Sequence, residues 1–202
     1  MQKTIAFFDF DGTITTKDTM LELIKFSNGK AAYYFGMIKL SPHLIALKLK
    51  FISATKAKEK MLAHFFGGDN LNTFNEKCKR FSKNILPLLI RPLAINKIKE
   101  HLNNNHEVVV VSASAENWVS LWCLQNNIEY IATRLEVTDD KITGKLSGPN
   151  CNGEEKVNRI KDKYILSEYS TIYCYGDTKG DKPMLQLATF ASYKPFRKKV
   201  SV

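Results

Sequence analysis

Two acidic residues, Asp9 and Asp11, stand one residue apart at the end of the apolar run 5–8. The run shows no alternation of polar and apolar residues, which predicts a strand buried on both faces of a parallel sheet. Open α/β sheets bind their ligands at the carboxyl ends of such strands. The chain must turn at Gly12, so one carboxylate can sit at the strand end and the other just past it. Two carboxylates held this close repel each other unless a cation or a shared proton lies between them, so we expect a chemical site here rather than a solvated turn.

A second pair of acids follows another apolar run, 171–175. Asp177 and Asp181 stand four residues apart, and only Gly176 separates that run from Asp177. An acidic turn is by itself usually solvated. Two apolar strands that each end in acids, separated by alternating strands and helices, instead indicate one shared site at the edge of the sheet.

The sequence Asp-Phe-Asp-Gly-Thr at 9–13 resembles the first signature, DxDGT, of the haloacid dehalogenase (HAD) superfamily, and within it the phosphatases related to phosphoserine phosphatase. The resemblance implies that Asp9 is a nucleophile that forms an aspartyl-phosphate and that Asp11 is the general acid/base that protonates the leaving oxygen. The residue types suit these roles, because a carboxylate is a competent nucleophile and a second acid can give and take a proton. Gly12 and Thr13 complete the signature and are assigned to phosphate binding.

Two further positions match the second and third motifs of the family. Ser112 follows the β-branched run 108–111, and the resemblance implies that its hydroxyl binds a phosphate oxygen together with nearby backbone amides. We assign Ser114 to capping of the next helix. Lys156 matches the lysine of the third motif, which offsets the charge of the nucleophile and of the transferred oxygens. A single lysine is a weak signal in so basic a chain, and Lys161 and Lys163 are the less favoured alternatives.

The second acidic pair resembles the last family motif, GDxxxD, whose first acid binds magnesium. The resemblance implies a Mg²⁺ ion held by the side chains of Asp9 and Asp177, with the backbone carbonyl of Asp11, a phosphate oxygen and waters completing its shell. Hard oxygen ligands suit Mg²⁺. We expect Asp181 to orient a metal-bound water or Lys156.

The expected fold class is α/β, with a doubly wound parallel sheet as the Rossmann-like core and an inserted small α-helical cap. We assign residues 1–15 and 88–202 to the catalytic core and 16–87 to the cap, because a mainly helical segment separates the first strand from the strands and helices that alternate after it, where the resemblance implies a helical cap. Residues 128–146 hold two β-like runs around a Thr-Asp-Asp-Lys turn, which predicts a hairpin extension.

Within the cap, Asn28-Gly29 predicts a helix stop and Ser41-Pro42 predicts the junction of two helices. Residues 29–52 are rich in apolar side chains, but lysines and Pro42 interrupt them, so a membrane-spanning helix is not expected. We favour packing of these side chains inside a small helical bundle. The alternative is an apolar rim beside lysines, suited to an amphiphilic substrate or to a bilayer surface.

Asp18 stands nine residues after Asp9, where phosphoserine phosphatases carry a substrate-reading glutamate. The resemblance therefore implies that Asp18 reads the substrate from the cap side. Residues 1–79 contain no arginine, whereas those enzymes grip the serine carboxylate with a cap arginine, and a lysine lacks its bidentate fork. A phosphomonoester in general is therefore favoured over phosphoserine.

Composition sets further bounds on the function. The four cysteines have no paired spacing, which argues against a zinc site and a disulfide framework and favours a reduced, cytoplasmic protein. The N-terminus leads directly into the first apolar run, so a signal peptide is not expected. The net charge of +10 is not accompanied by a nucleic-acid signature, so nucleic acid is not an expected partner. The charge can concentrate anionic substrates or draw the protein to an acidic membrane surface.

Taken together, these features predict a magnesium-dependent phosphomonoester hydrolase that acts on a small phosphorylated substrate. Four alternatives stay open: a lipid-phosphate phosphatase, with a substrate such as phosphatidylglycerophosphate; a phosphoserine phosphatase; a phosphotransferase or mutase that shares the aspartyl-phosphate; and a binding module without turnover. The oligomeric state is left open.

Overall fold

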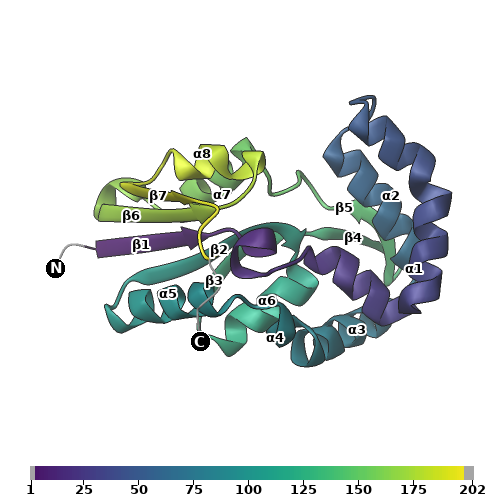
Figure 1. The fold of residues 1–202 in the computed structure, drawn as a ribbon, viewed down its shortest axis with the longest axis horizontal. Coiled ribbons are helices and arrows are strands. Elements are labelled where there is room, and N and C mark those ends of the chain that lie inside the picture. Colours follow the sequence, from purple (N-terminus) through teal and green to yellow (C-terminus); the bar gives the residue numbers. More distant parts are fainter. Residues whose placement is uncertain (1–2, 198–202) are drawn as a thin grey trace.

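A computed structural model describes residues 3–197 of the protein. Its main sheet has five parallel strands in the order β3-β2-β1-β6-β7. The strands are β1 (Lys3–Phe8), β2 (Glu107–Ala115), β3 (Glu129–Thr133), β6 (Tyr169–Gly176) and β7 (Phe190–Tyr193). The chain builds outward from β1 on one side and then crosses to β6 on the other, so the order reverses beside β1 (Figure 1). Such a switch point is where open α/β sheets bind ligands.

Helices cover both faces of this sheet, as Figure 1 shows. The helices are α1 (Thr19–Lys48), α2 (Ala54–Phe66), α3 (Leu71–Asn84), α4 (Leu86–Leu89), α5 (Pro92–Asn103), α6 (Glu116–Gln125), α7 (Glu154–Lys163) and α8 (Lys182–Leu185). α5 and α6 lie on one face, and α7 and α8 lie on the other. The predicted α/β class with a parallel sheet is confirmed.

The two faces of β1 belong to two separate hydrophobic clusters. Ala6 and Phe8 pack on the side of α5 and α6, whereas Ile5 and Phe7 pack on the side of α7 and α8. All four side chains are fully buried. Successive side chains of a strand point to opposite faces, so an unbroken apolar run is what a strand covered on both faces requires.

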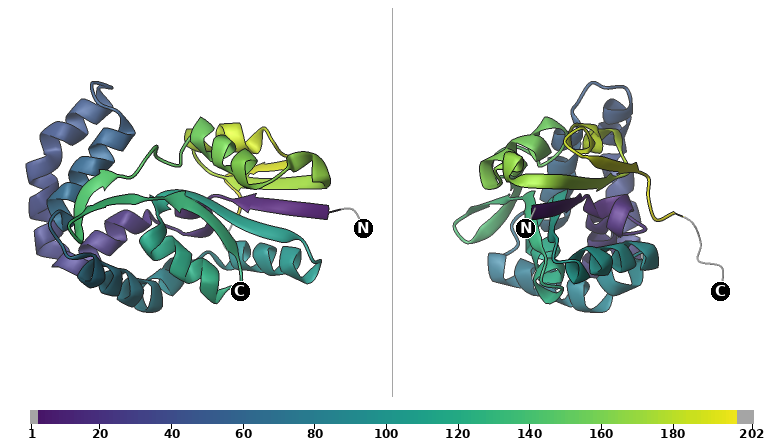
Figure 2. Two further views of the ribbon diagram at one scale, coloured as in Figure 1. Left: turned by 180° about the vertical axis from the view of Figure 1, so that it is seen from behind. Right: turned by 90° about the vertical axis from the view of Figure 1, so that its left-hand side faces the viewer.

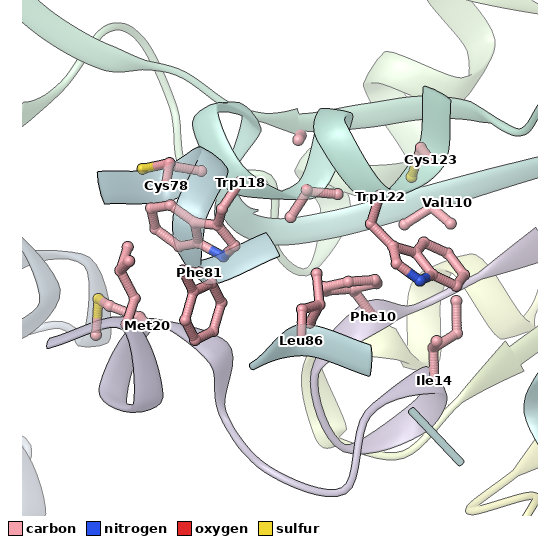
Figure 3. Packing of buried hydrophobic residues seen from close by; sticks show 14 of the residues in the cluster. Phe10, Ile14, Met20, Cys78, Phe81, Leu86, Val110, Trp118, Trp122 and Cys123 are labelled. Carbon is pink, nitrogen blue, oxygen red and sulfur yellow. The ribbon is translucent and has the colours of Figure 1, made fainter. Parts of the chain in front are cut away.

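The larger cluster also fixes the turn that follows β1. Figure 3 shows Phe10 and Ile14, which flank this turn, beside Trp122 of α6. The ring centroids of Phe10 and Trp122 are 5.5 Å apart. Trp118, one helical turn earlier, packs in the same cluster as Met20 at the start of α1. Burial of each such side chain stabilises the fold by about 1.5–3 kcal/mol, so α6 holds both ends of the acidic turn in place.

The segment that we assign to the cap forms the end of the molecule opposite to the start of β1 (Figure 2). The helix stop predicted at Asn28-Gly29 is present as a kink inside α1, where Gly29 has φ +82°. The junction predicted at Ser41-Pro42 is wrong, because α1 continues to Lys48. The fixed φ of proline is compatible with a helix. Because proline has no N–H, the carbonyl of Ile38 lacks its helical hydrogen-bond donor, but Ile38 lies on the exposed side of α1, where water can donate instead.

The predicted hairpin is confirmed as β4 (Leu135–Thr138) and β5 (Lys141–Leu146). It reaches away from the main sheet and contacts α2. A Cβ atom at Gly144, where φ is +85°, would lie 2.2 Å from the Cα atom of Ala63 in α2. The hairpin backbone also exchanges hydrogen bonds with the loop after α2, since Gly68 N–H donates to the Ile142 carbonyl and Ile142 N–H donates to the Asp69 carbonyl. Our division into core and cap stays a prediction.

Within residues 3–197, none of the helices combines the length and the hydropathy of a bilayer-spanning segment.

Candidate active site

Asp9 directly follows β1 and begins a tight turn, η1 (Phe10–Ile14). The turn is closed by a hydrogen bond from Thr15 N–H to the Phe10 carbonyl at 3.0 Å. Gly12 has φ +81°, and a Cβ atom there would lie 2.5 Å from Oδ2 of Asp177. A glycine is therefore needed both for the backbone conformation and for the close approach of the turn to Asp177.

Lys156, on α7, joins the two acidic pairs. Its Nζ donates to Oδ1 of Asp9 at 2.6 Å, to Oδ1 of Asp181 at 2.7 Å and to the Val111 carbonyl at 2.8 Å. The side chain is 1% exposed. Burial alone would lower the pKa of this ammonium, but the two carboxylates outweigh burial and raise the pKa above its ordinary value. Lys156 is therefore a fixed, permanently charged group at neutral pH.

The carboxylate of Asp181 is fully used by the protein itself. Oδ1 accepts from Lys156, and Oδ2 accepts from the Asp177 N–H at 3.1 Å and from the N–H and hydroxyl of Thr178, both at 2.8 Å. Burial would raise the pKa of this acid, but Lys156 and Thr178 hold it below the usual range. Asp181 thus holds Lys156 and the backbone of the last motif in place, which agrees with the expectation that it orients Lys156. The alternative role, orientation of a metal-bound water, stays a prediction.

One carboxylate oxygen of Asp9 lies buried near two other acids. Asp9, Asp177 and Asp181 each offer an oxygen within 4.8 Å of the other two. Oδ2 of Asp9 is buried and has no hydrogen-bond partner among residues 3–197. Burial raises the pKa of Asp9 to about 7, and the negative charges of Asp181 and Asp11 add to this against the opposing Lys156. An unpartnered buried carboxylate oxygen costs free energy that a bound cation offsets, so Asp9, with the nearby carboxylate of Asp177, fits Mg²⁺.

Asp177 also has protein partners. Its Oδ1 accepts from the Thr13 hydroxyl at 3.4 Å, and its Oδ2 accepts from Nη2 of Arg197 at 2.7 Å. The Thr13 hydroxyl therefore faces Asp177, so its assignment to phosphate binding stays a prediction. Arg197 was not identified from the sequence, because an exposed arginine near the end of the described chain carries no signal of its own.

Asp11 is held by groups on two other elements. Its Oδ1 accepts from both the N–H and the hydroxyl of Thr19 at 2.6 Å, and its Oδ2 accepts from the Ser114 hydroxyl at 2.6 Å. The indole N–H of Trp118 donates to the Thr19 hydroxyl at 2.9 Å. These hydrogen bonds fix the orientation of the Asp11 carboxylate. A fixed orientation fits the predicted role of Asp11 as the general acid/base that protonates the leaving oxygen.

The assignment of Ser114 to helix capping is wrong. The residue before α6 is Ala115, and no side chain caps that helix. β2 continues through Ser112 to Ala115, and its pairing with β3 is irregular between these two residues. Ser112 is fully buried, and its hydroxyl accepts from the Ser114 N–H at 2.9 Å. The serines two residues apart were the signal that could have identified Ser114.

Asp18, which directly precedes α1, lines a cavity of about 570 Å³ together with Asp9, Asp11 and Lys156. Its Oδ1 accepts from the Leu21 N–H at 3.0 Å and caps α1. Part of this carboxylate is therefore committed to the helix end, and substrate reading by Asp18 stays a prediction.

Lys58, on α2, reaches into the same cavity. Its Nζ donates to the Ala113 carbonyl and, at 3.2 Å, to Oδ1 of Asn150. Burial lowers the pKa of Lys58 while the charges of Asp11 and Asp18 oppose this effect. Lys58 could not be identified from the sequence, because one lysine among many in residues 16–87 carries no positional signal.

The remaining wall of the cavity is apolar and comes from α1 and α2. Its residues are Met20, Leu21, Met37, Leu44, Leu47, Ala54, Ala57 and Met61. The cavity therefore joins a charged floor, with acids and lysines, to an apolar wall that can accommodate a hydrocarbon group.

The sequence is similar to a known protein family and to several individual proteins. The family described as haloacid dehalogenase-like hydrolase matches residues 6–186. Protein CicA of Caulobacter vibrioides is 32% identical over 194 residues, which cover 95% of this chain and 86% of that protein. The probable phosphatase Rv3661 of Mycobacterium tuberculosis is 27% identical over 215 residues, which cover 99% of this chain and 73% of that protein.

Solved structures share the fold. A protein of unknown function from Bordetella pertussis Tohama I superposes with a TM-score of 0.79 at 20% identity, over 95% of this chain and 89% of that one. The phospho-aspartyl intermediate analogue of phosphoserine phosphatase superposes with a TM-score of 0.68 at 18% identity, over 95% of this chain and 86% of that one. The family match spans most of the sequence, and its motif residues meet at one end of the sheet. The chain therefore belongs to the haloacid dehalogenase-like hydrolases and shares the fold of phosphoserine phosphatase.

Proposed function

We propose that the protein is a Mg²⁺-dependent phosphomonoester hydrolase that works through an aspartyl-phosphate at Asp9. The observation that carries this proposal is that the two oxygens of the Asp9 carboxylate differ in their contacts. Oδ1 accepts a hydrogen bond from Lys156, whereas the buried Oδ2 has no hydrogen-bond partner among the described residues. When bound, Mg²⁺ would be held by Asp9 and Asp177 and would supply positive charge against the transferred phosphoryl oxygens. The matched family and the relative named as a probable phosphatase support the same reaction class.

The reaction then divides between residues with separate tasks. A carboxylate oxygen of Asp9 attacks phosphorus, and the bond from phosphorus to the leaving oxygen breaks while Asp11 gives that oxygen a proton. Lys156 offsets the charge of the phosphoryl group. Asp11, now ionised, takes a proton from the water that attacks the aspartyl-phosphate, which releases inorganic phosphate and restores Asp9.

The test is phosphate release from a panel of serine, sugar, nucleotide and lipid phosphates, with Mg²⁺ and with EDTA. We expect inorganic phosphate with Mg²⁺ and none with EDTA. Transfer of phosphate to a second organic acceptor, without inorganic phosphate, would instead make the protein a phosphotransferase or mutase. Binding of the substrates with no turnover would make it a binding module.

The apolar wall of the cavity favours a second, narrower proposal, that the substrate is an amphiphilic phosphate. Lipid phosphates such as phosphatidylglycerophosphate are one such class. The side chains of Met37, Leu44 and Leu47 would cover a hydrocarbon group beside the acids. Phosphoserine fits less well, because Asp18 is engaged at the end of α1 and residues 1–79 offer no arginine for its carboxylate.

A series of straight-chain alkyl phosphates tests this proposal. We expect kcat/KM to rise about fourfold per added methylene until the wall is covered, because each buried methylene contributes about 0.8 kcal/mol. In Leu44→Asn, kcat/KM should no longer rise with the length of the alkyl chain, and a short alkyl phosphate should be hydrolysed near the wild-type rate. A series that is flat in the wild-type enzyme would exclude an amphiphilic substrate.

Mg²⁺ and a proton should compete for Asp9. Since burial raises the pKa of Asp9 to about 7, the folded protein binds a proton there between pH 7 and pH 4 that an ordinary aspartate does not. Mg²⁺ needs the ionised carboxylate, so its apparent affinity should fall about tenfold for each pH unit below 7 and level off above it. Calorimetric titration with Mg²⁺ at several pH values measures this slope, and a constant affinity between pH 5.5 and pH 8 would contradict it.

Thr19→Val should lower kcat about tenfold and change KM little. The variant removes one of the hydroxyls that hold the Asp11 carboxylate in its orientation. A hydrogen bond to a charged group is worth about 1.5–3 kcal/mol. Thr19→Ser keeps the hydroxyl and should restore most of the rate. The same substitution at the exposed Thr16 provides a matched control. Equal kcat values for Thr19→Val and Thr16→Val would show that the hydroxyl does not position Asp11.

A further inference from the structure

The second half of α1 carries an apolar stripe on its outer side. Tyr34, Ile38, Ile45 and Leu49 follow one another at spacings of four, seven and four residues, which place them on one side of a helix. Phe35 lies at the edge of this row, and Phe51 follows just after the helix. All six side chains are more than half exposed, and Phe51 is 80% exposed. We call these six residues the outer stripe.

The core of the protein does not need the outer stripe. The opposite side of α1 already packs on α2, where Tyr33 stacks on Phe65 at 6.4 Å between ring centroids. A Cβ atom at Gly36 would lie 2.3 Å from the ring of Phe65, so the two helices are in close contact there. In Figure 1, α2 lies between the second half of α1 and β5, which leaves the far side of α1 at the edge of the molecule.

The surroundings of the outer stripe are cationic. Residues 23–58 contain seven lysines and neither aspartate nor glutamate. Lys30, Lys39, Lys48 and Lys50 are exposed along the part of α1 that follows the kink at Gly29 and just beyond the helix. By helical position, Lys30 and Lys48 lie to one side of the stripe and Lys39 to the other. An apolar row with lysines on both sides is the pattern of helices that lie in the headgroup region of anionic bilayers.

The charge also selects between possible partners. Two copies of this chain joined through the outer stripe would bring two sets of lysines together, and like charges across an interface weaken it. An anionic lipid surface instead pairs with the lysines while the aromatic and aliphatic side chains enter the acyl boundary. The same helix carries Met37, Leu44 and Leu47 on its inner side, in the wall of the active-site cavity. A bilayer against the outer stripe would therefore lie one helix diameter from that cavity.

We propose that the protein docks on anionic membrane surfaces through the outer stripe and its flanking lysines. Tyr34, Phe35 and Phe51 enter the interface between headgroups and acyl chains, and the lysines contact lipid phosphates. Docking is a binding property that goes beyond the proposed hydrolysis, and it is measured without any substrate.

Sedimentation with lipid vesicles tests the docking. We expect the wild-type protein to sediment with vesicles of phosphatidylcholine and phosphatidylglycerol and to stay in solution with phosphatidylcholine alone. Phe35→Ser combined with Leu49→Ser and Phe51→Ser should weaken binding to the mixed vesicles at least about tenfold. Replacement of Lys39, Lys48 and Lys50 by glutamine should weaken it about fivefold per lysine at low salt.

The matched control is Leu88→Ser with Leu124→Ser, two leucines that are 78% and 64% exposed outside the stripe. This control should bind vesicles like the wild type. All variants should hydrolyse p-nitrophenyl phosphate at the wild-type rate, because the substituted side chains lie outside the cavity. Equal binding to neutral and anionic vesicles, or unchanged binding of the stripe variant, would overturn the proposal.

Light scattering adds a third decisive readout. A dimer that becomes a monomer in the stripe variant would assign the stripe to a second copy of the chain and overturn docking on lipid. Failure to release phosphate from any substrate would overturn the proposed function and leave the vesicle result in place, so the two proposals fail separately.

Discussion

Asp9→Asn should lower phosphate release by at least about 10³-fold, because loss of a covalent nucleophile is among the most damaging single changes to an enzyme. The amide keeps the shape of the carboxylate and can still accept the hydrogen bond from Lys156 through its Oδ1. It cannot attack phosphorus, and with its oxygen on Lys156 it presents an NH2 group, which does not ligate Mg²⁺, in the position of the Asp9 Oδ2 atom. Both losses act on the same step. Steady-state release of inorganic phosphate at saturating Mg²⁺ measures the effect.

The fold should survive this change. Burial raises the pKa of Asp9 to about 7, so the ionised side chain is disfavoured in the metal-free fold, and a neutral amide removes that cost. We therefore expect the thermal unfolding temperature of metal-free Asp9→Asn not to fall. Asp162→Asn, the same substitution at an exposed position of α7, is the control and should retain full activity. Substantial residual turnover in Asp9→Asn would mean that another group attacks phosphorus.

Lys156→Met should remove activity and also destabilise the protein by about 3–5 kcal/mol, since removal of one member of a buried ionic group leaves uncompensated charge. Asp9 and Asp181 both lose their cation in this variant, and the Val111 carbonyl loses a donor. Methionine has a similar length, so the effect comes from charge and hydrogen bonding rather than from a cavity. Urea denaturation followed by circular dichroism gives the free energy of unfolding.

The destabilisation should depend on pH with a defined sign. The folded-state pKa of Asp181 is below its ordinary value of 3.8, so its ion pair stabilises the fold above about pH 4 and loses this contribution as the pH falls through the folded-state pKa. The gap in stability between the wild type and Lys156→Met should therefore be widest near neutral pH and narrow in acid. Lys161→Met, on the exposed side of α7, should unfold like the wild type. A gap below about 1 kcal/mol at pH 7 would contradict a structural role for Lys156.

The central part of the site could be predicted because each residue carries a local signal. Asp9 and Asp177 each follow an unbroken apolar run, and such runs become buried parallel strands whose ends meet. Lys156 was identified by its place between the second and fourth motifs rather than by its surroundings. The structure brings all three together.

The residues that complete the site could not be predicted, since their roles depend on contacts between distant segments. Thr19 meets Ser114 and Asp11 because Trp118 of α6 fixes the start of α1, and no spacing in the sequence encodes that meeting. Lys58 is one of seven lysines in residues 23–58 and differs from the others in its position on the inner side of α2.

The apolar segment 29–52 shows how two interpretations can share one helix. We favoured packing inside a bundle, and Tyr33, Gly36 and Leu40 do pack there. The alternative, an outward apolar rim beside lysines, describes the other side of the same helix. A continuous apolar composition does not reveal which positions face outward until the partners of the helix are known.

The central place of β1 determines when the active site can form during synthesis. Ile5 of β1 pairs with Glu107 on one side and with Ile172 on the other, so both neighbours of this strand leave the ribosome long after it does. Until then the aromatic side chains of β1 are without their native cover, and contacts so distant along the chain form slowly. A nascent chain that stops before β6 would carry Asp9 without Asp177. Catalysis therefore begins only after most of the chain has been translated, and unfinished chains are a natural target for chaperones.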